Sequence, residues 1–269
     1  MRALEVSRDV ESARADVDDA MVRAIRDGTA RSVDLVRRFD APTLRASAVH
    51  RVARAVTSSR AVVTLTLAGH ALALDSVRAL AAALAAAPAL RTLDLGDCAV
   101  DDSGAEAIAR ALFLAPSVAR LFLDRNALGP PACESLAASF RVGTKSRVRV
   151  LDLSNNPLGD AGAAALARGL VDGATRCDDE FDGAREGLAE LALRRCDVGD
   201  AGARRLAEAL RACEGIERVD LEGNRIGLEA RLALVDDAEA GRERRAPRVY
   251  VGGCGGEMER AFAGVARAE

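Results

Sequence analysis

Histidine and cysteine are the residue types in this chain whose side chains most often serve in catalysis and metal binding. The chain has only two histidines, His50 and His70, and six cysteines. Neither histidine has partners at the spacing of a nucleophilic triad, and neither belongs to a group with metal-ligand spacing. We therefore expect no catalytic residue, no metal ligand, no cofactor and no enzymatic activity.

Two local motifs resemble ligand-binding loops but are incomplete. Residues 249–256 run from an apolar strand into glycines, yet they lack both the GxGxxG spacing and the Lys-Ser/Thr pair of a P-loop. Residues 178–183 carry the acids and glycine that begin a calcium loop, but the twelfth position, which needs a bidentate glutamate, is Ala189. The second segment therefore reads as a solvated acidic loop around Phe181 or as a recognition loop, and the sequence leaves both readings open.

These candidates lie on a repeated element of about 28 residues. Each copy has apolar residues at its first, fourth and sixth positions, and Asn, Cys or His at its ninth. Repetition of this kind indicates a solenoid in which stacked units share one core. The first positions are Val62, Leu90, Val118, Val148, Leu188 and Ile216. The ninth positions are His70, Cys98, Asn126, Asn156, Cys196 and Asn224, with Cys254 in a worn seventh copy.

The second half of each copy changes from the alternation of a strand to the spacing of a helix face, as in Val77, Leu80 and Leu84. The same register, carried back 28 residues, predicts an earlier, degenerate copy. In that copy Phe39 and Leu44 would stand at the positions that Leu67 and Leu72 hold in the next copy. A helix face would run through Val49, Val52 and Val56.

Helix starts are also marked in the sequence. Asp102, Asp160 and Asp200 each stand two residues before a glycine, where we expect them to cap the helices that follow. In the third copy Pro130 and Pro131 fill this segment, and proline is compatible with a first helical turn.

The register of the copies argues against disulfides. Cys98 and Cys196 share the ninth position three strands apart, which at the usual strand spacing places them about 14 Å from each other. A disulfide needs Cα atoms within about 7 Å. We expect the ninth-position residues to satisfy backbone groups in the turns, Cys133 to face the core, and Cys177 and Cys213 to be the reactive thiols. This pattern favours a reduced, intracellular protein.

The copies resemble the ribonuclease-inhibitor class of leucine-rich repeats in their length, their ninth position and segments such as residues 159–170. The resemblance covers roughly residues 34–256. It implies an α/β fold, a curved horseshoe with a parallel sheet on the concave side and helices on the convex side. We expect an N-terminal helical cap over residues 1–33, repeats over 34–245 with an acidic insert at 172–187, and a worn last repeat with a C-terminal cap over 246–269.

The cap would contain an amphipathic helix over residues 10–27, through Val10, Val17, Met21, Val22 and Ile25. That helix would cover the open end of the stack or bind a partner. The net charge is −3, and no run of about 18 apolar residues indicates a membrane span. Acids throughout the first 20 residues exclude a secretory signal and argue against a transit peptide. We expect a cytoplasmic monomer.

Alternate strand residues point away from the helices and define the concave face. Seven acids and six arginines lie on it, a mixture that suits a folded protein partner and not a nucleic acid or a membrane. Phe122 and Tyr250 are unusual there, because aromatic residues make up only 3% of the chain. The predicted partner-binding residues are Asp94, Asp97, Arg120, Phe122, Asp124, Arg125, Asp152, Asn155, Arg194, Arg195, Asp220, Glu222 and Tyr250.

The resemblance implies a non-enzymatic protein–protein interaction module or scaffold, because the class includes nuclease inhibitors, sensor regions of NOD-like receptors and cytoskeletal scaffolds. It also includes a GTPase-activating protein for Ran, so the alternative is a regulator of a small GTPase. An arginine at a strand exit, Arg125 or Arg195, would then act at the bound nucleotide. The strongly acidic tail typical of that family is absent here, which weakens the alternative. A third possibility is a fragment or paralogue of a larger receptor's sensor region.

Overall fold

The computed structural model describes residues 4–7, 17–37, 42–115, 117–140, 146–174, 187–213, 215–239 and 247–252. Strands and helices alternate along this part of the chain. The strands are β1 (Leu4–Ser7), β2 (Ala30–Asp34), β3 (Thr64–Thr66), β4 (Thr92–Asp94), β5 (Arg120–Phe122), β6 (Val150–Asp152), β7 (Glu190–Ala192), β8 (Arg218–Asp220) and β9 (Arg248–Tyr250). The helices are α1 (Asp19–Arg26), α2 (Ala46–Ser58), α3 (Leu74–Ala86), α4 (Asp102–Leu114), α5 (Pro130–Ala138), α6 (Gly159–Ala174), α7 (Asp200–Ala212) and α8 (Leu228–Glu239).

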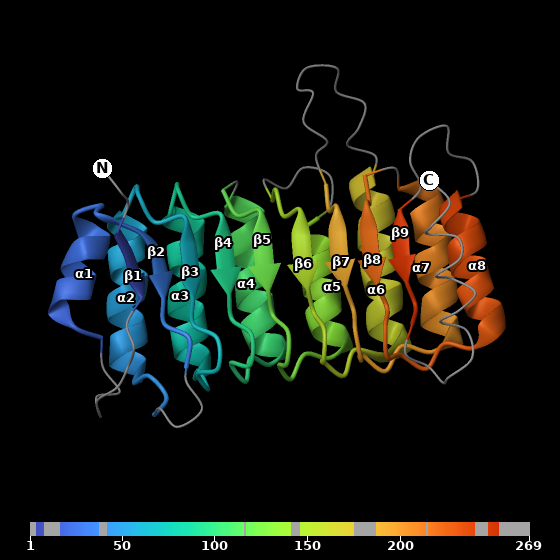
Figure 1. The fold of residues 1–269 in the computed structure, drawn as a ribbon, viewed down its shortest axis with the longest axis horizontal. Helices are drawn as coiled ribbons and strands as arrows, with labels where there is room; N and C mark the ends of the chain where they lie inside the picture. The colour runs from blue at the N-terminus through green and yellow to red at the C-terminus, as the bar shows by residue number, and fades with distance from the viewer. Residues whose placement is uncertain are drawn as a thin grey trace, which may run out of the picture.

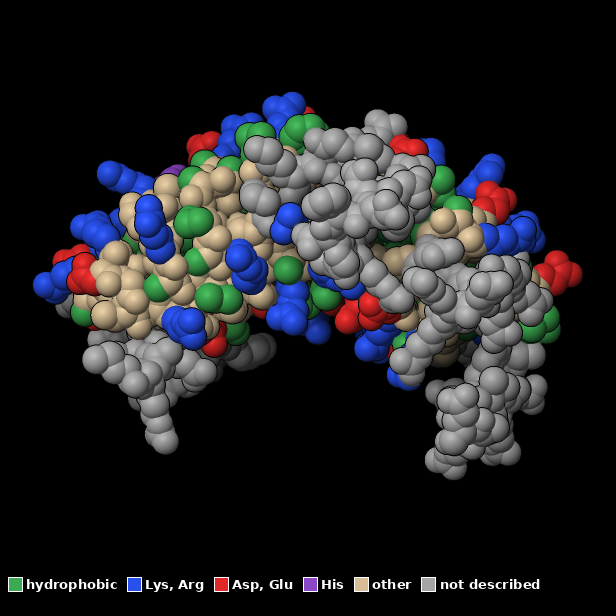
Figure 2. Space-filling view, turned by 90° about the horizontal axis from the view of Figure 1, so that it is seen from above, with side chains coloured by type: hydrophobic (Ala, Val, Ile, Leu, Met, Phe, Trp, Pro, Cys, Tyr) green, Lys and Arg blue, Asp and Glu red, His purple; other side chains and the backbone are tan. Residues whose placement is uncertain are grey.

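The strands form one parallel sheet in sequence order, from β1 to β9. Figure 1 shows this sheet as one layer in front of a layer of helices, with each helix beside the next one in the chain. Figure 2 shows from above that the molecule curves into an arch, and the sheet that faces the viewer in Figure 1 lies on its hollow side. The predicted α/β horseshoe is confirmed. Within the described residues, no helix has both the length and the apolar character needed to cross a membrane.

The core lies between the two layers and is built from the predicted repeat positions. Each three-residue strand from β3 to β8 buries its middle side chain, as Leu93 and Leu121 do. The sixth position of each copy is buried just as deeply, and Leu153 and Leu193 are 0% exposed. Because side chains alternate along a strand, the residues on either side of the buried one must face the hollow.

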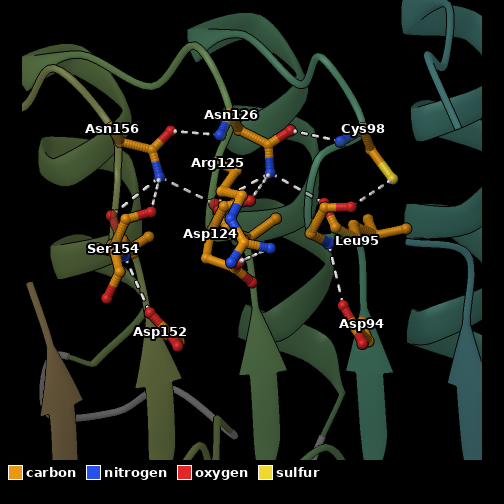
Figure 3. Close-up of polar contacts among 12 residues, drawn as sticks. Asp94, Leu95, Cys98, Asp124, Arg125, Asn126, Asp152, Ser154 and Asn156 are labelled. Carbon is orange, nitrogen blue, oxygen red and sulfur yellow. Dashed lines mark hydrogen bonds and ion pairs between the residues drawn. The ribbon is translucent and has the colours of Figure 1, made fainter. Parts of the chain in front are cut away.

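The ninth-position residues connect each turn to its neighbours, as predicted (Figure 3). The side-chain oxygen of Asn126 accepts from the backbone N–H groups of Cys98 and Val100 at 3.0 and 2.9 Å. Its amide nitrogen donates to the carbonyls of Leu95 and Leu123, both at 2.9 Å. Asn156 and Asn224 make the equivalent bonds one and three repeats further on. Buried backbone groups that would otherwise lack partners are thereby satisfied.

The prediction that three aspartates cap their own helices is wrong. The cap of α4 is Asp101, whose carboxylate accepts from the Gly104 N–H at 2.8 Å. The three aspartates lie in the first turn of their helices and reach sideways, so each caps the start of the next repeat's helix. Each carboxylate accepts from a glycine N–H: Asp102 from Gly129 at 2.7 Å, Asp160 from Gly199 at 2.7 Å and Asp200 from Gly227 at 2.6 Å. The predicted prolines do occupy the first turn of α5.

The N-terminal end differs from the prediction in its register. The N-terminal cap over residues 1–33 was predicted to contain a helix over 10–27, and α1 lies within that range. The same residues also contribute β1 and most of β2 to the sheet. Val33 pairs with Leu65, a spacing of 32 residues, because the connection from β2 to α2 is longer than in later repeats. Leu35, and not Phe39, therefore takes the place of Leu67. Leu44 packs against the core as predicted.

Several predicted features fall wholly or partly outside the described residues. These are Val10, Phe39, most of the acidic insert at 172–187, Cys177, Cys254 and the C-terminal cap. The strand of the worn last repeat is confirmed, because β9 pairs in parallel with β8. The division into cap, repeats and cap stays a prediction.

Candidate binding surface

The predicted binding residues lie on the hollow side of the sheet and along its edge. Figure 2 shows acidic and basic side chains along this hollow. Arg120 and Arg194 are exposed, while Phe122 and Tyr250 are partly buried. Asp220 is an exception, because only 6% of it is exposed and little of it remains to meet a partner. The predicted residues fall into three groups, two along the sheet and one at its edge.

The group at the C-terminal end, which lies on or just after β7, β8 and β9, is internally paired. Arg194 lies 2.7 Å from Glu222 and 3.9 Å from Asp220. Arg218 lies 3.8 Å from Asp220, and its guanidinium is 4.8 Å from the centre of the Tyr250 ring. Such cation–π stacking fixes the ring and covers part of its face. The charges of this group are therefore largely satisfied by one another.

The central group, which lies on or just after β4, β5 and β6, contains carboxylates that repel one another. Burial raises the pKa of Asp94, and the carboxylates of Asp34 and Asp152 raise it further. Burial and then Asp152 raise the pKa of Asp124, against the opposing effect of Arg125. A Cβ atom at Gly96 would lie 2.7 Å from a carboxylate oxygen of Asp124. A larger residue at position 96 would therefore displace that carboxylate. The central group concentrates negative charge in a half-buried setting.

Phe122 lies in the middle of this acidic group. The sheet register places it directly opposite Asp94 on β4 and Asp152 on β6. Its ring is partly exposed, and the exposed Arg120 precedes it by two residues on the same side of the strand. Asp94 and Asp152 are themselves held by bonds from the N–H groups of Gly96 at 3.0 Å and Ser154 at 2.9 Å. An apolar ring thus stands between two fixed carboxylates.

The third group marks the edge where the strands end. Its members share the eighth repeat position and a left-handed backbone, which lets the chain turn after each strand. Arg125 lies 3.7 Å from Asp124, and its side chain is 68% exposed. These residues are Asp97, Arg125, Asn155 and Arg195, with φ of 53°, 54°, 58° and 51°.

His70 and the buried cysteines serve structural roles in the part of the chain that the structure describes. The Nδ1 atom of His70 accepts from the Leu44 N–H at 3.1 Å, which leaves Nε2 to donate to the Leu35 carbonyl at 2.7 Å. Burial lowers the pKa of His70, in keeping with this neutral form. Burial also raises the pKa of Cys98, Cys133 and Cys196 to about 12, so these thiols are unreactive.

Cys213 was predicted to be reactive in a loop, and this is wrong, because only 3% of it is exposed. Among the described residues, no group of histidine, cysteine and acidic side chains could hold a metal ion.

Sequence reasoning missed one group of charged residues, the arginines of α1 and α2. Arg23, Arg26, Arg51 and Arg54 line one hollow at the N-terminal end of the stack. Their spacing of three residues within each helix was the available signal. Only the packing of α1 on α2 brings the two pairs together.

Comparison with known proteins agrees with this architecture. A family model described as Leucine Rich repeat matches residues 87–109, 147–167 and 188–207. The ribonuclease inhibitor of Sus scrofa is 35% identical over 109 residues, which are 40% of this chain and 21% of that protein. The chain therefore spans about a fifth of the length of this relative. It is built from leucine-rich repeats, and those repeats are ribonuclease-inhibitor-like.

Two solved structures match this chain at low similarity. One is leiomodin-1 actin-binding site 2, at 14% identity and a TM-score of 0.34, covering 81% of this chain and 86% of that one. The other is the complex of TLR13 with ssRNA13, at 17% identity and a TM-score of 0.44, covering 76% of this chain and 27% of that one. At these values neither structure bears on what this chain binds.

Proposed function

We propose that this chain is a non-enzymatic interaction module that holds a folded protein partner on its concave face, centred on Phe122. The observation that carries the proposal is the position of that ring between Asp94 and Asp152. A partly exposed aromatic ring that is flanked by fixed charges has the composition of an interface hot spot. The likeness to ribonuclease inhibitor over part of the chain supports the same class of function.

The charges of the central group specify the partner's chemistry. Asp94, Asp124 and Asp152 repel one another, so a lysine or arginine from a partner would relieve this repulsion as it binds. The same carboxylates would repel the phosphates of a nucleic acid, which supports a protein partner. The expected partner therefore presents an apolar pocket or ridge edged by basic side chains.

A cytoplasmic location is part of this proposal. The thiols of Cys98, Cys133 and Cys196 are free and buried. Free thiols throughout a repeat array are typical of proteins from reducing compartments.

The test is affinity capture from a lysate of the cells that make this protein, read by mass spectrometry. The wild type is compared with the double variant Phe122→Ala/Asp152→Arg and with a matched control, Phe113→Ala/Asp75→Arg. Phe113 on α4 is 48% exposed, and Asp75 lies on α3, so the control makes the same changes away from the sheet. We expect a partner that the control retains and the first variant loses. Equal retention by both folded variants would remove the concave face from the proposal.

Regulation of a small GTPase is the second candidate. The exposed guanidinium of Arg125 at the sheet edge favours it. If a GTPase is among the captured partners, its GTP hydrolysis should be measured with the wild type, Arg125→Ala and Arg195→Ala. A rate that none of the three proteins changes would exclude this function.

A further inference from the structure

A hollow at the N-terminal end of the stack is lined by an unusual concentration of arginine. It has a volume of about 490 Å³ and lies between α1 and α2, which Figure 1 shows at the blue end of the ribbon. Among the described residues, its lining holds four guanidinium groups and one carboxylate, which together carry a net charge of +3. The lining residues are Asp19, Val22, Arg23, Arg26, Arg51 and Arg54.

Two of the four arginines are held in place by the protein itself. Arg51 donates to the Val17 carbonyl at 3.0 Å and pairs with the carboxylate of Asp19. The Nε atom of Arg23 donates to the Asp19 carbonyl at 3.3 Å. These bonds fix one side of the hollow before any ligand arrives, which lowers the entropic cost of binding.

The other two arginines are free to meet a ligand. Neither Arg26 nor Arg54 has an ion pair or a side-chain hydrogen bond within the part of the chain that the structure describes. Arg26 comes from the last turn of α1, and Arg54 from the middle of α2. Two helices thus aim unpaired guanidinium groups at one space, where like charges repel unless an anion lies between them.

Ordinary helix electrostatics explains only half of this arrangement. Basic residues in a last helical turn stabilise the helix through its macrodipole, and Arg23 and Arg26 lie in such a turn. Arg51 and Arg54 lie at least four residues before the end of α2, beyond the reach of that effect. The macrodipole therefore does not account for the position of Arg51 and Arg54.

We propose that this hollow binds a small molecule carrying two or more phosphoryl groups. Guanidinium forks match phosphate oxygens in pairs, and one phosphoryl group is too small and too weakly charged to engage all four arginines. The volume lies within the range of small-molecule sites. The ligand is either a free phosphorylated metabolite or the same chemistry on a lipid headgroup. The proposal is independent of the concave face.

The first test is calorimetric titration with pyrophosphate, and with inorganic phosphate at matched ionic strength, because salt screens exposed charges. The wild type is compared with Arg26→Gln/Arg54→Gln. The matched control is Arg168→Gln/Arg204→Gln, which removes the same charge from exposed arginines on α6 and α7.

We expect one saturable pyrophosphate site in the wild type and in the control, and binding at least about tenfold weaker in the α1/α2 variant. The absence of saturable binding by the wild type would overturn the proposal. So would an equal loss in the two variants, or an equal affinity for phosphate and pyrophosphate.

Sedimentation with phosphatidylcholine vesicles, with and without phosphatidylinositol bisphosphate, identifies the source of the phosphoryl groups. Binding to the bisphosphate vesicles that Arg26→Gln/Arg54→Gln loses would support a lipid headgroup. Pyrophosphate binding without vesicle binding would support a free metabolite.

Discussion

Two stretches of one concave face use charge in opposite ways. On and just after β7 to β9, charged side chains pair with one another, and the Tyr250 ring is stacked under a guanidinium; the paired residues are Arg194, Arg218, Asp220 and Glu222. On and just after β4 to β6, the carboxylates on either side of Phe122 repel one another as like charges. The backbone scaffold is the same in both stretches, because the strands share register and length.

The comparison indicates where binding free energy is available. A partner that docks on the paired stretch must first displace or desolvate charge pairs that are already satisfied. A basic partner that docks on the central stretch removes a repulsion that the folded protein otherwise carries. For this reason we assign the binding centre to Phe122 and treat Tyr250 as a fixed part of the scaffold.

The largest effect should come from breaking the scaffold that both stretches share. Leu153→Asp places a charge in the core between them, at a cost on the order of 5 kcal/mol or more, comparable with the stability of a whole domain. We expect loss of cooperative unfolding in far-ultraviolet circular dichroism. Asp152→Arg, one residue earlier on the hollow side, should fold normally and unfold cooperatively. Equal behaviour of the two variants would contradict the assignment of inner and outer faces.

A smaller effect should separate the two stretches directly. Asp220 and Asp152 share the same repeat position and the same bond to a backbone N–H two residues later, at 3.1 and 2.9 Å. Asp220→Ala also removes two nearby guanidinium contacts, so we expect a loss of about 1–2 kcal/mol. Asp152→Ala loses the equivalent hydrogen bond but also relieves repulsion between carboxylates. We therefore expect a smaller loss of stability, about 0.5 kcal/mol. Urea denaturation measures both, and equal losses would show that the stretches do not differ electrostatically.

The sequence predicts the scaffold well because the repeat constrains it many times over. The buried positions of Leu93 or Leu153 follow from alternation, and the bonds of Asn126 follow from its place after the strand. Each repeat position occurs in several copies, and every copy tests its assignment independently. An error in one copy is therefore visible against the others.

The features that the sequence did not predict are those that occur once or depend on a neighbouring unit. The register of β2 was misplaced because the connection that follows it has no counterpart in later copies. Asp102 was assigned to its own helix because sequence spacing does not show that its carboxylate reaches Gly129 in the next repeat. The convergence of Arg26 and Arg54 depends on how α1 packs on α2, which no repeat pattern specifies.

The smallest expected effect concerns the pH dependence of the central stretch. Because the pKa of Asp94 is raised in the folded protein above its ordinary value of 3.8, the folded state binds this proton more tightly than the unfolded state does. The resulting stability is complete below pH 3.8 and is lost as the pH rises through the raised pKa. Asn at position 94 can keep the bond from the Gly96 N–H but has no charge.

Asp94→Asn should therefore match the wild type at the acid end and exceed it by up to about 0.5 kcal/mol near neutrality, after solvent screening. Chemical denaturation across this pH range measures the difference, with Asp75→Asn on α3 as the control away from the sheet. A difference that is the same at every pH would mean that Asp94 acts through its hydrogen bond alone. The central stretch would then lack the repulsion at Asp94 that distinguishes it from the paired one.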